Sequence, residues 1–186
     1  MSRSADGTYA SSLAVDCADL GSLNVYFKTQ DAAGNTSAAS SAAVFTVRDV
    51  TGPTASANNA TVSLDGSGAY TLLPLVLAAS STDNCESSMT YQLSKDNSAW
   101  SSSLAYSCAD VGSNTVYVRA SDGTNEGASV SITLTIQDNA APTVSASNAT
   151  VSLDGAGSVS VTGSDLSVVA SDNCAASPVV TLSHDN

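Results

Sequence analysis

Aspartate is the residue type in this sequence whose positions suggest chemistry, because its copies recur at a fixed spacing. Asp49 and Asp138 stand 89 residues apart, as do Asp83 and Asp172. Asp31 and Asp122 open short polar loops in matching places. Calcium takes six to eight oxygen ligands, which carboxylates from several loops could supply. The alternative is that these aspartates form Asx turns and caps on solvated loops, since no contiguous D-x-D-x-D-G loop is present.

Four cysteines form the second candidate group. They occupy two kinds of site, DNC at Cys85 and Cys174 and CAD at Cys17 and Cys108. We expect a Cys85–Cys108 disulfide, with Cys17 and Cys174 paired to cysteines outside this sequence or in a neighbouring chain. Such a bridge would stabilise a small domain by roughly 3 kcal/mol and imply an oxidising, extracellular setting.

Two alternatives to this bridge stay open, free buried thiols and a zinc site. Zinc is disfavoured because there is no C-x-x-C pair and the only histidine is His184. The expected bridge also carries a geometric tension. It requires the CAD segment to pass near the loop that holds DNC, which a plain seven-stranded sandwich does not guarantee.

No motif for catalysis is present, and we expect no enzyme and no catalytic residue. There is no G-x-S-x-G, H-E-x-x-H, P-loop or G-x-G-x-x-G. His184 stands alone, and its counterpart 89 residues earlier is Lys95. Trp100, with Tyr9 in the corresponding place, could stack on sugars, although packing against the protein is the favoured interpretation.

Internal repetition organises the whole chain. The octet NATVSLDG occurs at 59–66 and again, unchanged, at 148–155, and CADVGSNTVYV at 108–118 follows CADLGSLNVYF at 17–27. A fixed period over this much sequence indicates a folded unit copied in tandem. The predicted boundaries are the C-terminal half of a repeat over 1–48, a complete repeat over 49–137, and the N-terminal half of the next over 138–186.

Within each repeat the apolar residues alternate with polar ones, which is typical of half-buried β-strands. In 128–137, Val130, Ile132, Leu134 and Ile136 share one face. The D-G pair of the octet predicts a tight hairpin between ATVSL and AYTLL, and Pro74 predicts a bend or an edge after it. The sequence therefore predicts an all-β protein of tandem immunoglobulin-like antiparallel β-sandwiches, about 89 residues per repeat.

This topology brings the start of a repeat, its B–C loop and its F–G loop to one pole. Asp49, Asp83 and Asp122 would therefore converge where two repeats meet. Asp138 and Asp172 hold the matching places at the next junction. Calcium is the only cofactor that this arrangement suggests.

Charge and hydropathy limit the possible partners. Asp and Glu number 17 against 5 Lys and Arg, a net charge of −12. This balance repels nucleic acid and offers no basic patch to an anionic membrane. No apolar run approaches the roughly 20 residues of a membrane span. We therefore expect no nucleic-acid partner and no membrane insertion.

The motifs taken together resemble the hyalin-repeat family, in the variants repeated in giant surface adhesins of gliding bacteria. The resemblance rests on NATVSLDG, SDNC, CADVG-x-NTVYV, SDGTN or DAAGN, and QDNAAPT, and it covers the whole chain. It implies immunoglobulin-like, secreted modules that serve as stalk or adhesive units at the cell surface. Many relatives carry another cysteine in the last strand, where this sequence has NTSAAS and NEGASVS.

We therefore expect a structural repeat of an extracellular surface adhesin or filament, forming a rod-like stalk or fibre. The alternative is a module that itself binds carbohydrate or a surface, through Trp100 or the F–G loop. The half repeats would each expose an apolar sheet face. The expected partners are adjacent repeats of the same longer chain, or copies of this chain joined head to tail in a filament.

Overall fold

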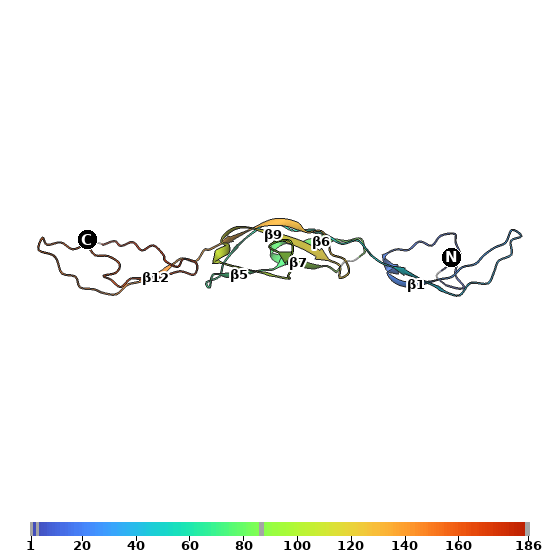
Figure 1. Ribbon diagram of the computed structural model, residues 1–186, viewed down its shortest axis with the longest axis horizontal. Coiled ribbons are helices and arrows are strands. Elements are labelled where there is room, and N and C mark those ends of the chain that lie inside the picture. Colours follow the sequence, from blue (N-terminus) through green and yellow to red (C-terminus); the bar gives the residue numbers. More distant parts are fainter. Residues whose placement is uncertain (1, 3, 86–87, 185–186) are drawn as a thin grey trace. The chain divides into compact units, whose positions relative to one another are not determined.

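The chain divides into two compact units that do not follow the predicted repeat boundaries. A computed structural model describes residues 2, 4–85 and 88–184, and Figure 1 traces them with strands as arrows. Unit 1 consists of Met1–Ser56, Ser80–Tyr91 and Arg119–Ser129, and unit 2 of Ala57–Ala79, Gln92–Val118 and Val130–Asn186. Both units take residues from 49–137. The repeat boundaries themselves stay a prediction.

A four-stranded sheet in the order β4-β10-β9-β7 lies mostly in unit 2. The strands are β4 (Ala60–Ser63), β7 (Thr90–Ser94), β9 (Gly112–Ser121) and β10 (Val130–Gln137). β9 and β10 pair antiparallel, with Val116 opposite Ile132. β4 joins the other edge of β10 in parallel, with Leu134 opposite Ala60. Strands distant in sequence therefore lie side by side, as in a sandwich.

A second layer covers this sheet. β5 (Ala69–Leu72) and β8 (Leu104–Ser107) form a two-stranded antiparallel sheet in which Tyr70 lies opposite Tyr106. The 3-10 turn η2 (Pro74–Leu77) follows β5, with Pro74 in its first turn and Ala78 in the left-handed conformation that ends it. Proline fixes φ and suits this position, so the predicted interruption after β5 is a 3-10 turn. The architecture is all-β, as predicted.

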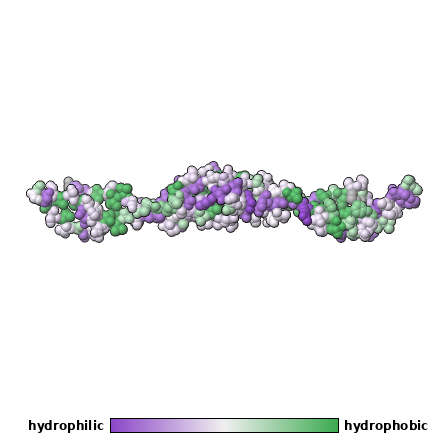
Figure 2. All heavy atoms as spheres, in the orientation of Figure 1, coloured by the Kyte–Doolittle hydropathy of each residue, from purple (hydrophilic) through white to green (hydrophobic). Residues whose placement is uncertain are grey.

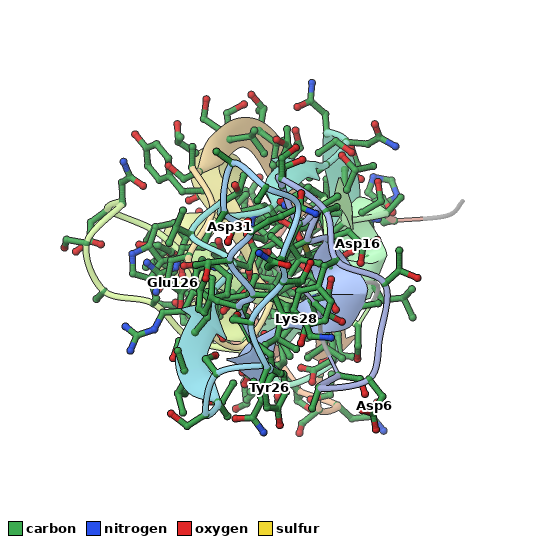
Figure 3. All side chains as sticks on the ribbon, turned by 90° about the vertical axis from the view of Figure 1, so that its right-hand side faces the viewer. Asp6, Asp16, Tyr26, Lys28, Asp31 and Glu126 are labelled. Atoms are coloured by element: carbon green, nitrogen blue, oxygen red, sulfur yellow. A yellow bond between two sulfur atoms is a disulfide. The ribbon has the colours of Figure 1, made fainter. Side chains whose placement is uncertain are left out.

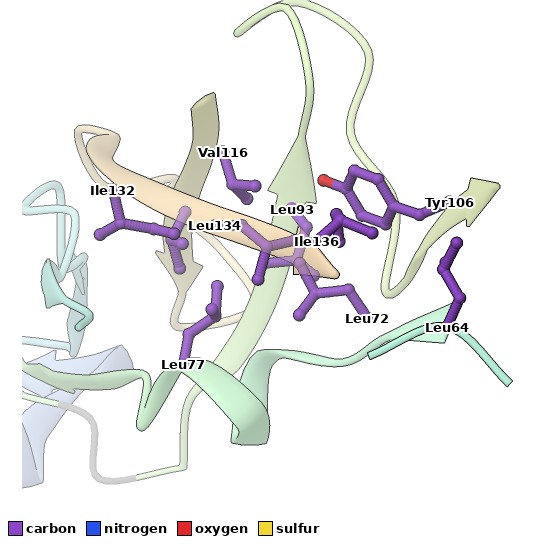
Figure 4. Close-up of a cluster of buried hydrophobic side chains, with 10 residues drawn as sticks. Leu64, Leu72, Leu77, Leu93, Tyr106, Val116, Ile132, Leu134 and Ile136 are labelled. Atoms are coloured by element: carbon purple, nitrogen blue, oxygen red, sulfur yellow. The ribbon is translucent and has the colours of Figure 1, made fainter. Parts of the chain in front are cut away.

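The core of unit 2 lies between these two layers (Figure 4). Leu134, Val116 and Leu93 are fully buried on the larger sheet. Leu72 and Leu77 are fully buried against them. The alternation in β10 holds, since Ile132, Leu134 and Ile136 are buried and Thr133 is exposed.

The predicted hairpin of the octet is wrong in one respect. The tight turn forms, with Asp65 N donating to Ala69 O at 2.9 Å and Gly68 N donating to Asp65 O at 2.9 Å. β4 and β5 do not pair with each other, however, because β4 pairs with β10 and β5 with β8. The turn therefore carries the chain from one sheet to the other.

The described residues of unit 1 form two small antiparallel sheets. β1 (Gly21–Val25) pairs with β2 (Ala43–Val47), and β3 (Thr54–Ser56) pairs with β6 (Ser80–Thr82). Val25 lies opposite Ala43 in the first sheet. The register of β1 and β2 repeats that of β9 and β10, since Gly21 lies opposite Val47 as Gly112 lies opposite Ile136.

An open apolar groove of about 400 Å³ lies on the sheet of β1 and β2. Its lining residues are Leu13, Val15, Val25, Phe27, Ala43, Val44 and Phe45. Phe27 is 44% exposed and Phe45 47% exposed. Figure 2 shows apolar side chains gathered over this part of the chain.

The last 47 described residues, 138–184, form only the short pair β11 (Thr143–Ser145) and β12 (Val169–Ser171). Apolar side chains are exposed here too, among them Val161 at 43% and Leu182 at 48%. The described residues of 1–48 and those of 138–184 thus each present uncovered apolar side chains.

Candidate functional site

The CAD motif is a capped 3-10 turn that presents a cysteine. η1 (Cys17–Asp19) is capped by Asp16, whose Oδ1 accepts from Ala18 N at 2.9 Å (Figure 3). Asp19 Oδ2 accepts from Asp16 N at 3.1 Å, which completes a capping box. A glycine with positive φ follows, Gly21 at 107°. The aspartate of CAD therefore holds the turn.

The same device recurs in η3 (Cys108–Asp110). Ser107 N and Oγ both donate to Asp110 Oδ2, at 2.8 and 3.1 Å. The backbone donor at Ser107 lowers the pKa of Asp110, and Lys95 adds to this through an ion pair of 3.4 Å. Lys95 also lies 4.0 Å from the centre of the Tyr106 ring, and burial followed by the charge of Asp110 raises the pKa of Tyr106 to about 12.

The DNC motif is an Asx turn that presents the second kind of cysteine. Asp83 Oδ1 accepts from Cys85 N at 2.9 Å, and Asp172 Oδ1 accepts from Cys174 N at 3.1 Å. An aspartate two residues before a backbone donor suits this turn. The first residue of DNC therefore orients the third.

The disulfides are Cys17–Cys85 and Cys108–Cys174, with Cα–Cα distances of 5.1 and 5.2 Å. The predicted Cys85–Cys108 bridge is wrong, and so is the prediction that Cys17 and Cys174 find partners outside this sequence. Each bridge joins a CAD turn to the DNC turn that follows 68 or 66 residues later. In terms of the repeat, CAD of one copy bonds to DNC of the next. The observed pairing removes the geometric difficulty that the expected Cys85–Cys108 bridge carried.

The octet contributes to the second bridge. Gly68 follows the octet in its turn, is buried, and has φ of 76°. A Cβ atom there would lie 2.5 Å from Cys108 Sγ and 3.0 Å from Asn173 O. Asn173 Nδ2 donates to Asp65 O at 3.0 Å. The turn of one copy is thus packed against the DNC loop of the next, a role that the sequence analysis did not assign to it.

Three of the predicted metal ligands converge in unit 1. One carboxylate oxygen from each of Asp49, Asp83 and Asp122 lies within 4.8 Å of the others, and all three residues are half-buried. The three come from the start of the predicted repeat, the DNC loop and the loop after β9, as the sequence predicts. Three carboxylates at this separation repel one another, and a divalent cation relieves such repulsion.

The Asx-turn interpretation holds for the same three residues. Asp122 Oδ1 accepts from Thr124 N and Asn125 N, both at 2.6 Å, and donors from Asn125 hold the pKa of Asp122 below its ordinary value. Asp49 Oδ1 accepts from Thr51 N at 3.0 Å. The turns therefore orient the carboxylates whether or not they hold a cation.

Close backbone approach brings the loop after β9 to the start of the predicted repeat. Asn125 Nδ2 donates to Asp49 O at 3.3 Å. A Cβ atom on Gly52 would lie 2.5 Å from Glu126 O, and one on Gly127 would collide with Pro53 O. Both positions therefore require glycine. The sequence does not reveal the role of these two glycines, because a glycine in a polar loop carries no mark of a close contact.

The two remaining predicted ligands, Asp138 and Asp172, are not gathered, nor is Asp31, which opens the loop that matches the one at Asp122. Asp31 closes its own loop, accepting from Asn35 N and Nδ2 at 2.8 and 2.9 Å, and these donors lower its pKa (Figure 3). Asp138 and Asp172 belong to no group of three such ligands among the described residues. Asp172 Oδ2 is buried without a hydrogen-bond partner.

The residues proposed for sugar binding are not assembled into a site. Trp100, the candidate for stacking on sugars, is half-buried. His184, which was considered only for catalysis, is exposed. The exposed aromatic side chains among the described residues, Phe27 and Phe45, lie instead in the apolar groove of unit 1.

Two disulfides indicate a secreted, non-cytoplasmic protein, because such bridges persist in oxidising compartments. No helix among the described residues is long and apolar enough to cross a membrane.

Comparison with known proteins assigns no family. No family model and no curated protein matches the chain. Among solved structures, an endo-fucoidan hydrolase from glycoside hydrolase family 107 matches with 19% identity and a TM-score of 0.29. The match covers 66% of this chain and 20% of the hydrolase, and a likeness this weak carries no functional argument.

Proposed function

We propose that the chain is a structural repeat array of an extracellular surface adhesin or filament, in the manner of the hyalin-repeat stalks that its motifs resemble. The observation that supports this most is the bridge pattern. Both disulfides join the same two motifs in the same order, so the connection can propagate along a series of copies. A module that works alone has no use for a bond that links it to its neighbour.

The apolar faces support the same proposal. Val25, opposite Ala43, corresponds to Val116, opposite Ile132. Leu72, Leu77 and Leu93 bury the second pair in unit 2. Their counterparts 89 residues on are Val161, Leu166 and Leu182. A segment such as the one that holds Val161, Leu166 and Leu182 would cover a face such as the one that holds Val25 and Ala43. The core of unit 2 shows the same kind of packing.

Two arrangements would cover these exposed apolar faces. Further repeats of one longer chain can complete both, or the C-terminal residues of one copy can complete the N-terminal face of the next. The second is a heterologous contact that extends into a fibre. We propose the longer chain, and polypeptide mass from the native source in denaturant and reductant decides. A mass far above 18.4 kDa supports it, and a mass near 18.4 kDa requires the head-to-tail fibre.

Calcium at Asp49, Asp83 and Asp122 is the cofactor that we propose for the junctions. Each of the three carboxylates offers one ligand oxygen, and these oxygens lie within 4.8 Å of one another. Calcium would hold three loops of one pole together. It would supply structure and no reaction.

A carbohydrate- or surface-binding module remains the second candidate. The exposed polar loop after β9 favours it, and the half-buried Trp100 weighs against it. A glycan array with the folded chain distinguishes the two, since binding that disappears with Trp100→Ala would favour the module.

The experiment for the structural role uses the native source. Antibodies raised against residues 49–137 should label intact cells, and an in-frame deletion of whole 89-residue periods should shorten the labelled structure in proportion. Labelling that appears only after lysis would contradict the proposal. Deletions that abolish attachment without changing length would favour the binding module.

A further inference from the structure

The two disulfides together create a covalent route through the chain that avoids most of its residues. From Cys17 the route passes directly to Cys85, then along the backbone to Cys108, and directly again to Cys174. Residues 18–84 and 109–173 lie in loops that the bridges close. The loops do not overlap in sequence. The backbone from Cys85 to Cys108 is therefore the only part between the outer cysteines that belongs to the route.

We propose that these bridges carry tension from one junction to the next and confine extension of the array to the segment between Cys85 and Cys108. The significance for a stalk rests on the proposed function. The mechanical property follows from the connectivity alone. When the ends are pulled, a closed loop bears no load, because its two ends are fixed to each other.

The shielded loops contain most of the folded structure. The loop of 109–173 holds β9 and β10, which provide Val116 and Leu134 to the core, and the loop of 18–84 holds β4 and β5. Pulling cannot lengthen these strands while the bridges persist. A transient opening of the core therefore leaves both loops tethered for refolding.

The loaded segment contains β7 and β8 and two core side chains, Leu93 and Tyr106. A chain extends by at most about 3.3–3.6 Å per residue. The segment thus yields about 80 Å per period, compared with roughly 300 Å for all 89 residues of a period without bridges. The bridges set this limit at about a quarter of the unbridged length.

Reduction should remove the limit. The bridges span 68 and 66 residues, so opening both adds about 450 Å to the fully extended chain. The array is thus short and tethered in oxidising surroundings and highly extensible after reduction. Nothing in this response requires a change in the folded state at rest.

The test is single-molecule pulling of the full 186-residue chain from its two ends, first oxidised and then with reductant added to the chamber. We expect a fully extended length that is about 450 Å greater after reduction. An extended length that does not change would overturn the proposal. Fully extended length depends only on which bonds exist, so a destabilised fold does not obscure the result.

Matched insertions show which backbone carries the load. One variant receives six Gly and Ser residues after Asn97, in the loaded segment, and the other receives them after Gly155, in the exposed turn of a shielded loop. Only the first should lengthen the oxidised chain, by about 20 Å, whereas both should lengthen the reduced one. The opposite pattern would indicate a Cys85–Cys108 bridge and reject the proposal.

This pulling test is independent of where the protein resides. A chain with the expected extension that fails to label intact cells would retain the mechanical inference and reject the surface role. A surface array that is labelled on intact cells but whose extended length does not change with reductant would retain the surface role and reject the mechanical inference.

Discussion

At the scale of single residues, the fold depends on a few fully buried side chains. Only 12% of residues are charged and the chain has few aromatics, so Leu and Val must fill the core. Leu134 lies in the middle of β10 with none of its surface exposed. Its neighbour Thr133 points to solvent, which makes the pair a test of burial within one strand.

Leu134→Ala should lower the free energy of unfolding by about 2–5 kcal/mol, because it removes apolar contacts and leaves a cavity. Thr133→Ala is the matched control and should change it by less than about 0.5 kcal/mol. Chemical denaturation monitored by the fluorescence of Trp100 measures both. Equal effects of the two substitutions would contradict the assignment of the buried face.

Acid should destabilise the fold through its turn aspartates. Backbone donors at Ala99 and Ser98 hold the pKa of Asp96 below its ordinary value of 3.8, and the Ser67 side chain, followed by the backbone donor at Ala69, lowers the pKa of Asp65. A pKa that is depressed in the folded state adds stability that is fully present above the unfolded value and is lost as pH falls through the folded value. Thermal melting should therefore be nearly constant from pH 7 to pH 5 and fall below about pH 4. Asp96→Asn should make this fall shallower, and a main loss above pH 5 would refute the explanation.

At the scale of elements, two copies of one turn share their backbone conformation but not their surroundings. Gly68 and Gly157 both have φ of 76°. A Cβ atom at Gly68 meets Cys108 Sγ and Asn173 O, whereas one at Gly157 meets nothing within 4 Å. Comparing substitutions at the two glycines therefore separates the effect of contact with the Cys108–Cys174 bridge from the effect of backbone strain.

Gly68→Ala should destabilise the protein more than Gly157→Ala and slow formation of the Cys108–Cys174 bond. Both variants share the strain of a positive φ, about 1–2 kcal/mol. Oxidative refolding followed by thiol alkylation and peptide mapping measures the bond. Indistinguishable refolding of the two variants would exclude a role of the octet turn at the junction.

Calcium should bind the three-carboxylate group and raise the melting temperature. At a calcium concentration about 100 times the dissociation constant, the stabilisation is about 2.7 kcal/mol. Asp122→Asn should abolish the shift. Asp31→Asn is the control, because Asp31 forms the same kind of turn outside the group. An unchanged melting curve with calcium and with chelator would remove the proposed site.

The sequence predicts local structure here better than pairing. The alternation in β10 and the convergence of Asp49, Asp83 and Asp122 follow from residue pattern and topology, and the structure confirms both. The bridges do not follow, because four cysteines allow three connectivities and the choice depends on which turns meet. The capping boxes before Cys17 and Cys108 were a signal for rigid turns, but they do not identify the partner.

At the scale of the whole molecule, the exposed apolar groove and the net charge of −12 oppose each other. Apolar side chains favour association, whereas like charges on two copies disfavour it. Salt screens the charges over about 10 Å at 0.1 M and leaves the apolar contact intact. Association should therefore strengthen with ionic strength.

Light scattering of the 186-residue chain should show a mass that rises above 18.4 kDa with concentration and with salt. Phe27→Ser together with Phe45→Ser should reduce this association, since both side chains line the groove. Val50→Ser is the control, because Val50 is 82% exposed and lies outside the groove. A monomer at all concentrations and salt levels would argue against head-to-tail completion.

The two consecutive bridges also determine how cleavage by a protease affects this chain. A single cut of the backbone between residues 18 and 84, or between 109 and 173, leaves both pieces joined through sulfur. A cut between Cys85 and Cys108 separates them. An array of such copies would therefore survive nicking over most of its length without shedding any part, and its one vulnerable stretch in each period is the short segment that holds β7 and β8.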